Sequence, residues 1–428
     1  MAIALFQPAD QIKAMQEQKL KLLLEYVARY SPFYKDLFAR HRIDIASIRT
    51  LEDLSRIPTT GKADLQTRNG DFLCVPTNRI AEYTATSGTL GSPVTIALTD
   101  KDLDRLAYNE YGSFTCADGS AGDIYQLMLT LDRQFMAGIA YYSGLRRLGA
   151  GIIRVGPGVP ALQWETIRRL KPTVLVAVPS FLLKLIRYAH DRHIDMAGSS
   201  VRKAICIGEN IRNQDFSFNI LGRKITEAWD LGLYSTYAST EMQTAFTECG
   251  AGRGGHLQPE LLIVELLDEH DSPVGSGMPG EVTITTLGVE GMPLIRYKTG
   301  DICSWSDEPC SCGRKTLRLS PIIGRRQQMI KFKGTTLYPP ALFDLLAEME
   351  EILDFAVEVY SNEVGLDEIL LHIVPADNSE EGDHRIRSYL QARLRVSPRI
   401  EYVGPEQLQK MQFPEAARKA IKFIDRRK

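Results

Sequence analysis

Helix and strand signals alternate in the middle of the chain, and this alternation limits the fold more than any other feature. Residues 162–170 and 181–190 have apolar side chains at helical spacing, and residues 173–178 form a continuous apolar run typical of a buried strand. Residues 203–208 supply a second strand of the same kind. Strand, helix and strand at this spacing predict a largely parallel sheet covered by helices. Ligands of such sheets bind beyond the carboxyl ends of the strands.

Before and after this middle part, the sequence predicts other combinations of helices and strands. An amphipathic helix is predicted for residues 9–30. Short strands separated by Gly/Pro turns are predicted after about residue 261, at residues 261–267, 281–286 and 302–305. Beyond residue 324 the sequence predicts strands at residues 355–359, 369–374 and 400–403 and a helix at residues 380–394.

We therefore expect an α/β protein with two domains. The large N-terminal domain, residues 1–324, would hold mixed or parallel sheets and a β-rich part at about residues 246–320. Residues 325–428 are enough for a small, mobile α+β C-terminal domain of about 100 residues.

Composition excludes several classes of protein. The 428 residues carry a net charge of −2, which gives no electrostatic reason to expect nucleic acid or an anionic membrane as a partner. No apolar run approaches the ~18 residues of a membrane helix, and the first residues lack the pattern of a signal peptide. We expect a cytoplasmic protein. The seven cysteines are odd in number and unevenly spread, which argues against a disulfide framework.

A loop rich in hydroxyl groups and glycine precedes a β-prone run at residues 94–98. Residues 86–93 read Thr-Ser-Gly-Thr-Leu-Gly-Ser-Pro. Glycine lets the backbone approach a ligand closely, and hydroxyl and N–H groups donate to anionic oxygens, so this loop can cradle a polyphosphate. No Gly-Lys-Ser/Thr follows, so it is not a Walker A loop. Taken alone, a loop of this composition is more often an ordinary turn.

Five segments together resemble the adenylate-forming superfamily, most closely its phenylacetate–CoA ligase branch. They are the loop at 86–93, Gly208-Glu209, Tyr237-Ala-Ser-Thr-Glu241, Leu294-Ile-Arg-Tyr-Lys-Thr-Gly-Asp301 and Ile323-Gly-Arg325. The resemblance implies a carboxylic acid that attacks the α-phosphate of ATP, giving an acyl-adenylate and pyrophosphate, and a coenzyme A thiol that then displaces AMP. An aromatic acid of the phenylacetate, benzoate or anthranilate type is the implied substrate.

The resemblance also assigns roles to residues. The nucleotide-binding residues would be Thr86, Ser87, Gly88, Thr89, Gly91, Gly208, Glu209, Tyr237, Asp301 and Arg325, and the catalytic residues Thr240, Glu241 and Lys419. A carboxylate such as Glu241 suits Mg²⁺, and Asp301 can accept hydrogen bonds from both ribose hydroxyls. Lys419 would bridge carboxylate and α-phosphate, where an ammonium stabilises developing charge. Phe135, Tyr141 and Ala238 would line the acid pocket.

Cysteine and histidine spacing indicates a metal site. Cys249 is followed by His256, and Cys310 and Cys312 lie about sixty residues further on. Three thiolates and one imidazole make a closed tetrahedral site for structural zinc. Several members of the resembling family carry the same pair of motifs. The alternative is a set of free cysteines in a β-rich part of the fold.

Some positions depart from the family pattern. Ser92 replaces a lysine in the phosphate loop, Ser235 replaces a common Asp or Asn, and Gln327 and Gln328 replace an acidic pair at the hinge about which the small domain would rotate. We expect these changes to alter substrate choice or turnover.

Two other functions stay open at the level of sequence. One is an enzyme that loads a carrier protein or a protein thiol, and the other is a catalytically silent nucleotide-binding scaffold. A homodimer is suggested by the family alone.

Overall fold

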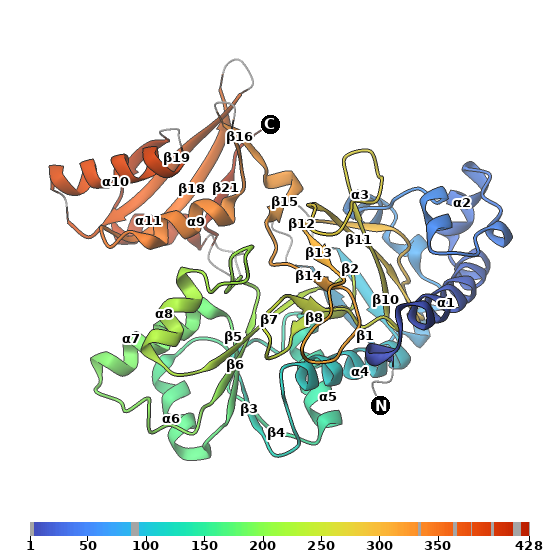
Figure 1. The fold of residues 1–428 in the computed structure, drawn as a ribbon, viewed down its shortest axis with the longest axis horizontal. Coiled ribbons are helices and arrows are strands. Elements are labelled where there is room, and N and C mark those ends of the chain that lie inside the picture. Colours follow the sequence, from blue (N-terminus) through green and yellow to red (C-terminus); the bar gives the residue numbers. More distant parts are fainter. Residues whose placement is uncertain are drawn as a thin grey trace. The chain divides into compact units, whose positions relative to one another are not determined.

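The computed structural model describes residues 4–86, 94–332, 335–362, 366–377, 379–394, 398–413 and 421–427 (Figure 1). The chain divides into two compact units. The first consists of Met1–Thr299 and Cys303–Ile322, and the second of Gly300–Ile302 and Ile323–Lys428. The continuous part of the second unit thus begins two residues before Arg325, where the sequence predicts the C-terminal domain to begin, whereas Gly300–Ile302 were expected in the N-terminal domain.

A nine-stranded sheet forms the centre of the first unit, in the order β13-β14-β9-β8-β7-β6-β5-β3-β4. Strands β4, β3, β5, β6 and β7 are parallel, and β8, β9, β14 and β13 continue the sheet antiparallel. Their bounds are β3 (Ile124–Leu127), β4 (Gly151–Arg154), β5 (Val174–Ala177), β6 (Lys203–Ile207), β7 (Gly232–Ser239), β8 (Thr244–Glu248), β9 (Gly255–His256), β13 (Trp305–Ser306) and β14 (Arg318–Leu319).

Helices cover both faces of the parallel part, as alternate side chains of the strands require. Leu175 and Ala177 of β5 pack with α6 (Pro160–Leu170), α7 (Pro179–Asp191) and α8 (Ile220–Ala228). Val174 and Val176 face the other side, where α4 (Asp100–Cys116) and α5 (Met136–Leu148) pack. The predicted, largely parallel sheet covered by helices, and with it the α/β fold class, is confirmed.

A second layer of strands belongs to the β-rich part. Strands β10 (Leu262–Leu267), β11 (Gly280–Thr286), β12 (Tyr297–Cys303) and β15 (Gly324–Arg325) form a four-stranded sheet in that order. Strands β1 (Glu82–Ala85) and β2 (Thr95–Leu98) pair as an antiparallel hairpin around residues 86–94. Residues of β2, β10, β11 and β12 share one hydrophobic core with α1 (Ala9–Tyr30) and α2 (Pro32–Arg40), and α3 spans Lys62–Thr67. The helix predicted for residues 9–30 has the bounds of α1.

The second unit is a small α+β fold. Strands β18 (Ile352–Ser361), β19 (Asp367–Pro375), β20 (Arg399–Tyr402) and β21 (Phe423–Asp425) form a sheet in the order β20-β19-β18-β21, and β16 (Ile330–Phe332) pairs with β17 (Thr335–Leu337). Helices α9 (Pro339–Glu348) and α10 (Glu380–Leu394) contribute to the core on one face of the four-stranded sheet. Helix α11 (Pro405–Gln412) packs on the other face.

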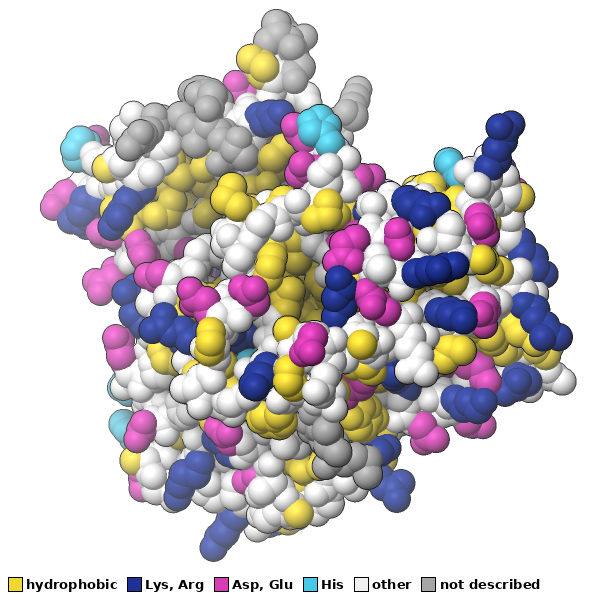
Figure 2. All heavy atoms as spheres, turned by 45° about the vertical axis from the view of Figure 1, so that its right-hand side comes forward, with side chains coloured by type: hydrophobic (Ala, Val, Ile, Leu, Met, Phe, Trp, Pro, Cys, Tyr) yellow, Lys and Arg dark blue, Asp and Glu magenta, His cyan; other side chains and the backbone are white. Residues whose placement is uncertain are grey.

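Acidic and basic side chains are interspersed over the surface shown in Figure 2, the pattern expected of a chain with nearly balanced charge. Among the helices of the described ranges, none has the length and apolar character needed to cross a bilayer.

Candidate functional site

The two ends of the predicted phosphate loop are tied together. The Thr86 N–H donates to the Val94 carbonyl at 2.9 Å, and the Val94 N–H donates to Thr86 Oγ1 at 3.0 Å. The hairpin of β1 and β2 therefore brings residues 86 and 94 side by side and closes the loop at its base. Ser87, Gly88, Thr89 and Gly91, the remaining predicted phosphate ligands, lie outside the described residues.

Gly208 and Glu209 follow β6 at the carboxyl edge of the parallel sheet. Gly208 has a φ of +74°, a left-handed conformation that favours glycine. The carboxylate of Glu209 accepts hydrogen bonds from the N–H of Ser180 at 2.8 Å and from its hydroxyl at 2.9 Å. Because Ser180 lies in the first turn of α7, Glu209 acts as a cap for that helix. A nucleotide contact from this segment would come from its main chain.

The segment Tyr237–Glu241 ends β7 and enters the turn to β8. Tyr237 is half-buried and stacks on Phe246 with ring centroids 5.9 Å apart. Ala238 is exposed, and Thr240 and Glu241 are partly exposed in the turn. Tyr297 donates its hydroxyl hydrogen to Glu241 Oε1 at 3.4 Å. The turn thus places Thr240 and Glu241 within reach of a ligand at the carboxyl edge of the sheet.

Asp301 and Arg325, which both belong to the second unit, are neighbours across an antiparallel strand pair. They occupy paired positions in β12 and β15, and Arg325 Nε donates to Asp301 Oδ1 at 3.2 Å. The Asp301 side chain is 10% exposed and that of Arg325 is 47% exposed. Two residues that are 24 positions apart in the sequence therefore form one candidate site. Lys419 lies outside the described residues.

The residues predicted to line the acid pocket lie in different environments. Phe135 precedes α5 and is partly buried, whereas Tyr141 is 3% exposed within a core on the α4–α5 face of the sheet. Tyr141 packs edge-on against Phe114 at 5.8 Å, and burial raises the pKa of its hydroxyl well above the usual value. The N–H of Ala85 donates to the carbonyl of Gln134, so the segment before Phe135 is fixed to the end of β1.

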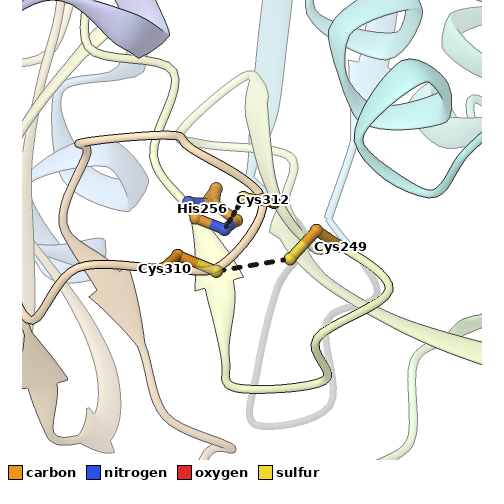
Figure 3. Close-up of side chains that lie close together, drawn as sticks. All are labelled: Cys249, His256, Cys310 and Cys312. Atoms are coloured by element: carbon orange, nitrogen blue, oxygen red, sulfur yellow. Dashed lines mark hydrogen bonds between the residues drawn. The ribbon is translucent and has the colours of Figure 1, made fainter.

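Cys249, His256, Cys310 and Cys312 converge on one point (Figure 3). Their ligand atoms all lie within 4.8 Å of one another. The Sγ atoms of Cys249 and Cys310 are 3.6 Å apart, and Cys312 Sγ is 3.5 Å from His256 Nε2. A tetrahedral zinc ion with Zn–S bonds of about 2.3 Å holds its ligand atoms about 3.5–3.8 Å apart. The donor set and its spacing fit zinc.

The surroundings of this cluster suit coordination. Burial, with Arg314 and Arg318 nearby, lowers the pKa of His256 to about 3, so its imidazole is neutral at physiological pH. His256 Nδ1 is 3.3 Å from the hydroxyl of Thr316. A hydrogen bond there would fix the ring orientation and leave Nε2 for a metal. Cys249 follows β8, His256 ends β9, and Cys310 and Cys312 lie between β13 and β14.

The other cysteines are not among the four converging ligands. Cys74, Cys116, Cys206 and Cys303 are 6% exposed or less, and Cys303 ends β12. His372 is buried, and its two ring nitrogens each lie 3.3 Å from a carboxylate oxygen, of Glu358 and Glu401.

The sequence analysis missed a group of buried polar residues on α4. Arg105, Asn109, Glu110 and Ser113 are all 7% exposed or less. Because these polar residues interrupt the helical spacing of apolar side chains, the sequence pattern did not predict helix α4. A signal was nevertheless present, because Thr99 and Asp102 form a capping box at the start of α4.

Comparison of the sequence with known proteins identifies a family and several relatives of this chain. Residues 43–291 match the family described as AMP-binding enzyme. The chain is 29% identical to the phenylacetate-coenzyme A ligase of Thermus thermophilus, over 92% of this chain and 90% of the relative. It is 28% identical to the enzyme of that name from Escherichia coli, over 80% of this chain and 78% of the relative.

The fold has counterparts among solved structures. It resembles 2-hydroxyisobutyryl-CoA ligase in complex with 2-HIB-AMP, with a TM-score of 0.85 and 22% identity over 99% of this chain and 91% of that one. It also resembles the anthranilate CoA ligase AuaEII, with a TM-score of 0.59 and 18% identity over 80% and 66% of the two chains. At these identities the likeness concerns the fold.

The family match covers more than half of the chain and includes Tyr237–Glu241 and the residues that flank the phosphate loop. The chain belongs to the AMP-binding enzyme family, as an adenylate-forming ligase of the phenylacetate–CoA ligase-like branch.

Proposed function

We propose that this enzyme activates an aromatic carboxylic acid with ATP and Mg²⁺ and then transfers the acyl group to coenzyme A. The observation that carries the proposal is the likeness to phenylacetate–CoA ligase over nine-tenths of both chains. The anthranilate CoA ligase of similar fold is bound to anthranoyl-AMP, an acyl-adenylate of an aromatic acid. Phenylacetate, benzoate and anthranilate are therefore the first acids to test.

In the first half-reaction a carboxylate oxygen attacks the α-phosphorus, and the bond to pyrophosphate breaks. The acid is already ionised at neutral pH, so the step needs alignment and charge stabilisation rather than a general base. We assign Mg²⁺ to Glu241, and the triphosphate to the hydroxyl of Thr86 and to the hydroxyl and N–H groups of Thr240 and of the loop between 87 and 91. Lys419 would stabilise the charge that develops on the phosphate.

The nucleoside would be held by Tyr237, by the main chain at Gly208 and by Asp301. A carboxylate with two acceptor oxygens suits the two ribose hydroxyls. Arg325, already bonded to Asp301, would orient that carboxylate or reach a phosphate. Phe135 and Ala238 would line the acid pocket, with Tyr141 behind them. In the second half-reaction the thiol attacks the acyl carbon and AMP leaves.

Pyrophosphate exchange into ATP tests the first half-reaction. A panel of carboxylic acids is assayed without a thiol, and an aromatic acid should support the fastest exchange. Adding coenzyme A or a holo-carrier protein then identifies the acceptor by the mass of the product. A product on the carrier alone would favour the carrier-loading alternative, and no exchange with any acid would favour a silent scaffold.

We further propose that Cys249, His256, Cys310 and Cys312 hold a structural zinc ion. The four ligands fill a tetrahedron and leave no open position for chemistry. Elemental analysis should find about one zinc per wild-type chain. Cys310→Ser should lose it, and an unchanged metal content in that variant would refute the assignment. Cys206→Ser, in a buried cysteine outside the cluster, is the matched control.

A further inference from the structure

Helix α4 supports the main chain at the start of β8. Arg105 Nη1 donates to the carbonyl of Gln243 at 2.8 Å, and the N–H of Ala245 donates to Asn109 Oδ1 at 3.2 Å. Strand β9 pairs with β8 further on, at Thr247 and Glu248. Side chains of α4 thus hold the part of β8 that directly follows the turn containing Glu241.

Arg105 joins three segments of the first unit. Besides Gln243, its guanidinium donates to the carbonyls of Leu287 at 2.8 Å and Leu261 at 2.6 Å. The residue is 7% exposed, and burial lowers the pKa of Arg105 to about 10, so it stays protonated at neutral pH. A buried cation is costly unless its donors are satisfied, and three main-chain carbonyls satisfy this guanidinium. In return, Arg105 fixes the positions of those carbonyls.

One of these carbonyls belongs to Gln243, whose backbone conformation is unusual. This residue has a φ of +51°, a left-handed conformation that is strained for a side chain of its size. Its side chain is 1% exposed, and both of its amide atoms lack a hydrogen-bond partner within the described chain. Such strain persists where the surroundings impose it, and it gathers at functional sites. The bond from Arg105 to the Gln243 carbonyl is one such constraint.

We propose that Arg105 is a positioning residue for adenylation: by fixing the carbonyl of Gln243, it holds the turn that presents the Glu241 carboxylate to Mg²⁺–ATP. This inference rests on the proposed function. Gln243 lies two residues after Glu241, so a change of its backbone torsions would move that carboxylate. The contact of Tyr297 with Glu241 would then be the second support of the same side chain.

The test uses Arg105→Met and Arg105→Lys in the full chain. Removing the support of a metal ligand typically costs about 10- to 100-fold in metal affinity or activity. Arg105→Met should therefore raise the Mg²⁺ concentration for half-maximal pyrophosphate exchange by about 10-fold or more, and Arg105→Lys should recover part of the loss. In the Glu241→Gln variant, adding Arg105→Met should change the Mg²⁺ dependence of exchange little further, because both substitutions act through the Glu241 carboxylate.

Gln16→Met is the matched control. Gln16 is 6% exposed and donates to the carbonyls of Pro259 and Leu262, beside the Leu261 carbonyl that Arg105 also meets. It should lower the melting temperature without changing the Mg²⁺ dependence. The inference would be overturned if Arg105→Met lost the same fraction of exchange activity at every Mg²⁺ concentration and if its effect added fully to that of Glu241→Gln.

Titration of ATP binding by calorimetry, with and without Mg²⁺, separates this inference from the proposed function. Wild type should bind ATP more tightly with Mg²⁺, and Arg105→Met should lose most of that difference. If no acid supports exchange in wild type, the proposed function fails, and the binding measurement still decides the role of Arg105. A Mg²⁺ effect that is equal in wild type and Arg105→Met would refute that role.

Discussion

Replacing Asp301 by asparagine should damage catalysis far more than stability. The amide keeps one acceptor oxygen, so about one hydrogen bond from a ribose hydroxyl to a charged acceptor is lost. Such a bond contributes about 1.5–3 kcal/mol. Since about 1.4 kcal/mol corresponds to a factor of ten, kcat/KM for ATP should fall about 10- to 100-fold.

The cost to the folded state should be small. Asp301 pairs with Arg325, whose side chain is about half exposed at 47%. An ion pair with one partner open to solvent contributes about 0–1 kcal/mol, so loss of this pair should lower the free energy of unfolding by no more than that. Pyrophosphate exchange at varied ATP concentration gives kcat/KM, and urea denaturation gives the free energy of unfolding.

Asp367→Asn provides the matched control. This carboxylate also lies in the second unit, where it accepts hydrogen bonds from the N–H of Lys331 at 2.7 Å and from Arg427 at 3.1 Å. Its replacement should lower stability and leave KM for ATP unchanged. The reasoning is refuted if Asp301→Asn stays within about twofold of wild type in kcat/KM, or if both variants lose activity in proportion to stability.

Three further predictions concern the Cys/His cluster, Glu241 and Glu110. A strong zinc chelator should lower the melting temperature of wild type and leave that of Cys310→Ser unchanged, and equal shifts in calorimetry would count against the metal site. Glu241→Gln should reduce exchange about 10- to 100-fold at low Mg²⁺ and recover at high Mg²⁺; a loss independent of Mg²⁺ would contradict its role as a metal ligand. Burial raises the pKa of Glu110 from 4.5 to about 8, so between these values the folded chain binds more protons than the unfolded one and stability falls as pH rises. Glu110→Gln should reduce the fall in the free energy of unfolding over this pH range by an amount on the order of a few kcal/mol. Urea midpoints that fall equally with pH in wild type and variant would refute this prediction.

Periodic patterns and spacing revealed the fold class and several of its elements. The predicted helices at residues 9–30 and 380–394 have the bounds of α1 and α10, because both carry a regular apolar face toward a core. The predicted run at residues 203–208 corresponds to β6, whose alternate residues are buried on both faces. Helix α4 was missed because its buried face carries Asp102, Arg105, Asn109 and Glu110, which bind main-chain and side-chain groups instead of packing as apolar residues.

The candidate site was predictable only where a motif is local. The Cys and His spacing identified the four residues that meet in Figure 3. No sequence rule showed that Glu209 would cap α7, or that Arg105 would reach the Gln243 carbonyl 138 residues away. Such contacts depend on which side chains tertiary packing brings together, and periodicity carries no information on them.

The central claim is that the acid is activated as an acyl-adenylate, and isotope transfer tests it most directly. With an aromatic acid labelled by ¹⁸O in both carboxylate oxygens, one oxygen should bridge to the α-phosphorus and leave with AMP when the thiol attacks. Mass spectrometry of the products should then find one ¹⁸O in AMP and one in the thioester. Unlabelled AMP, or label in inorganic phosphate, would contradict the account.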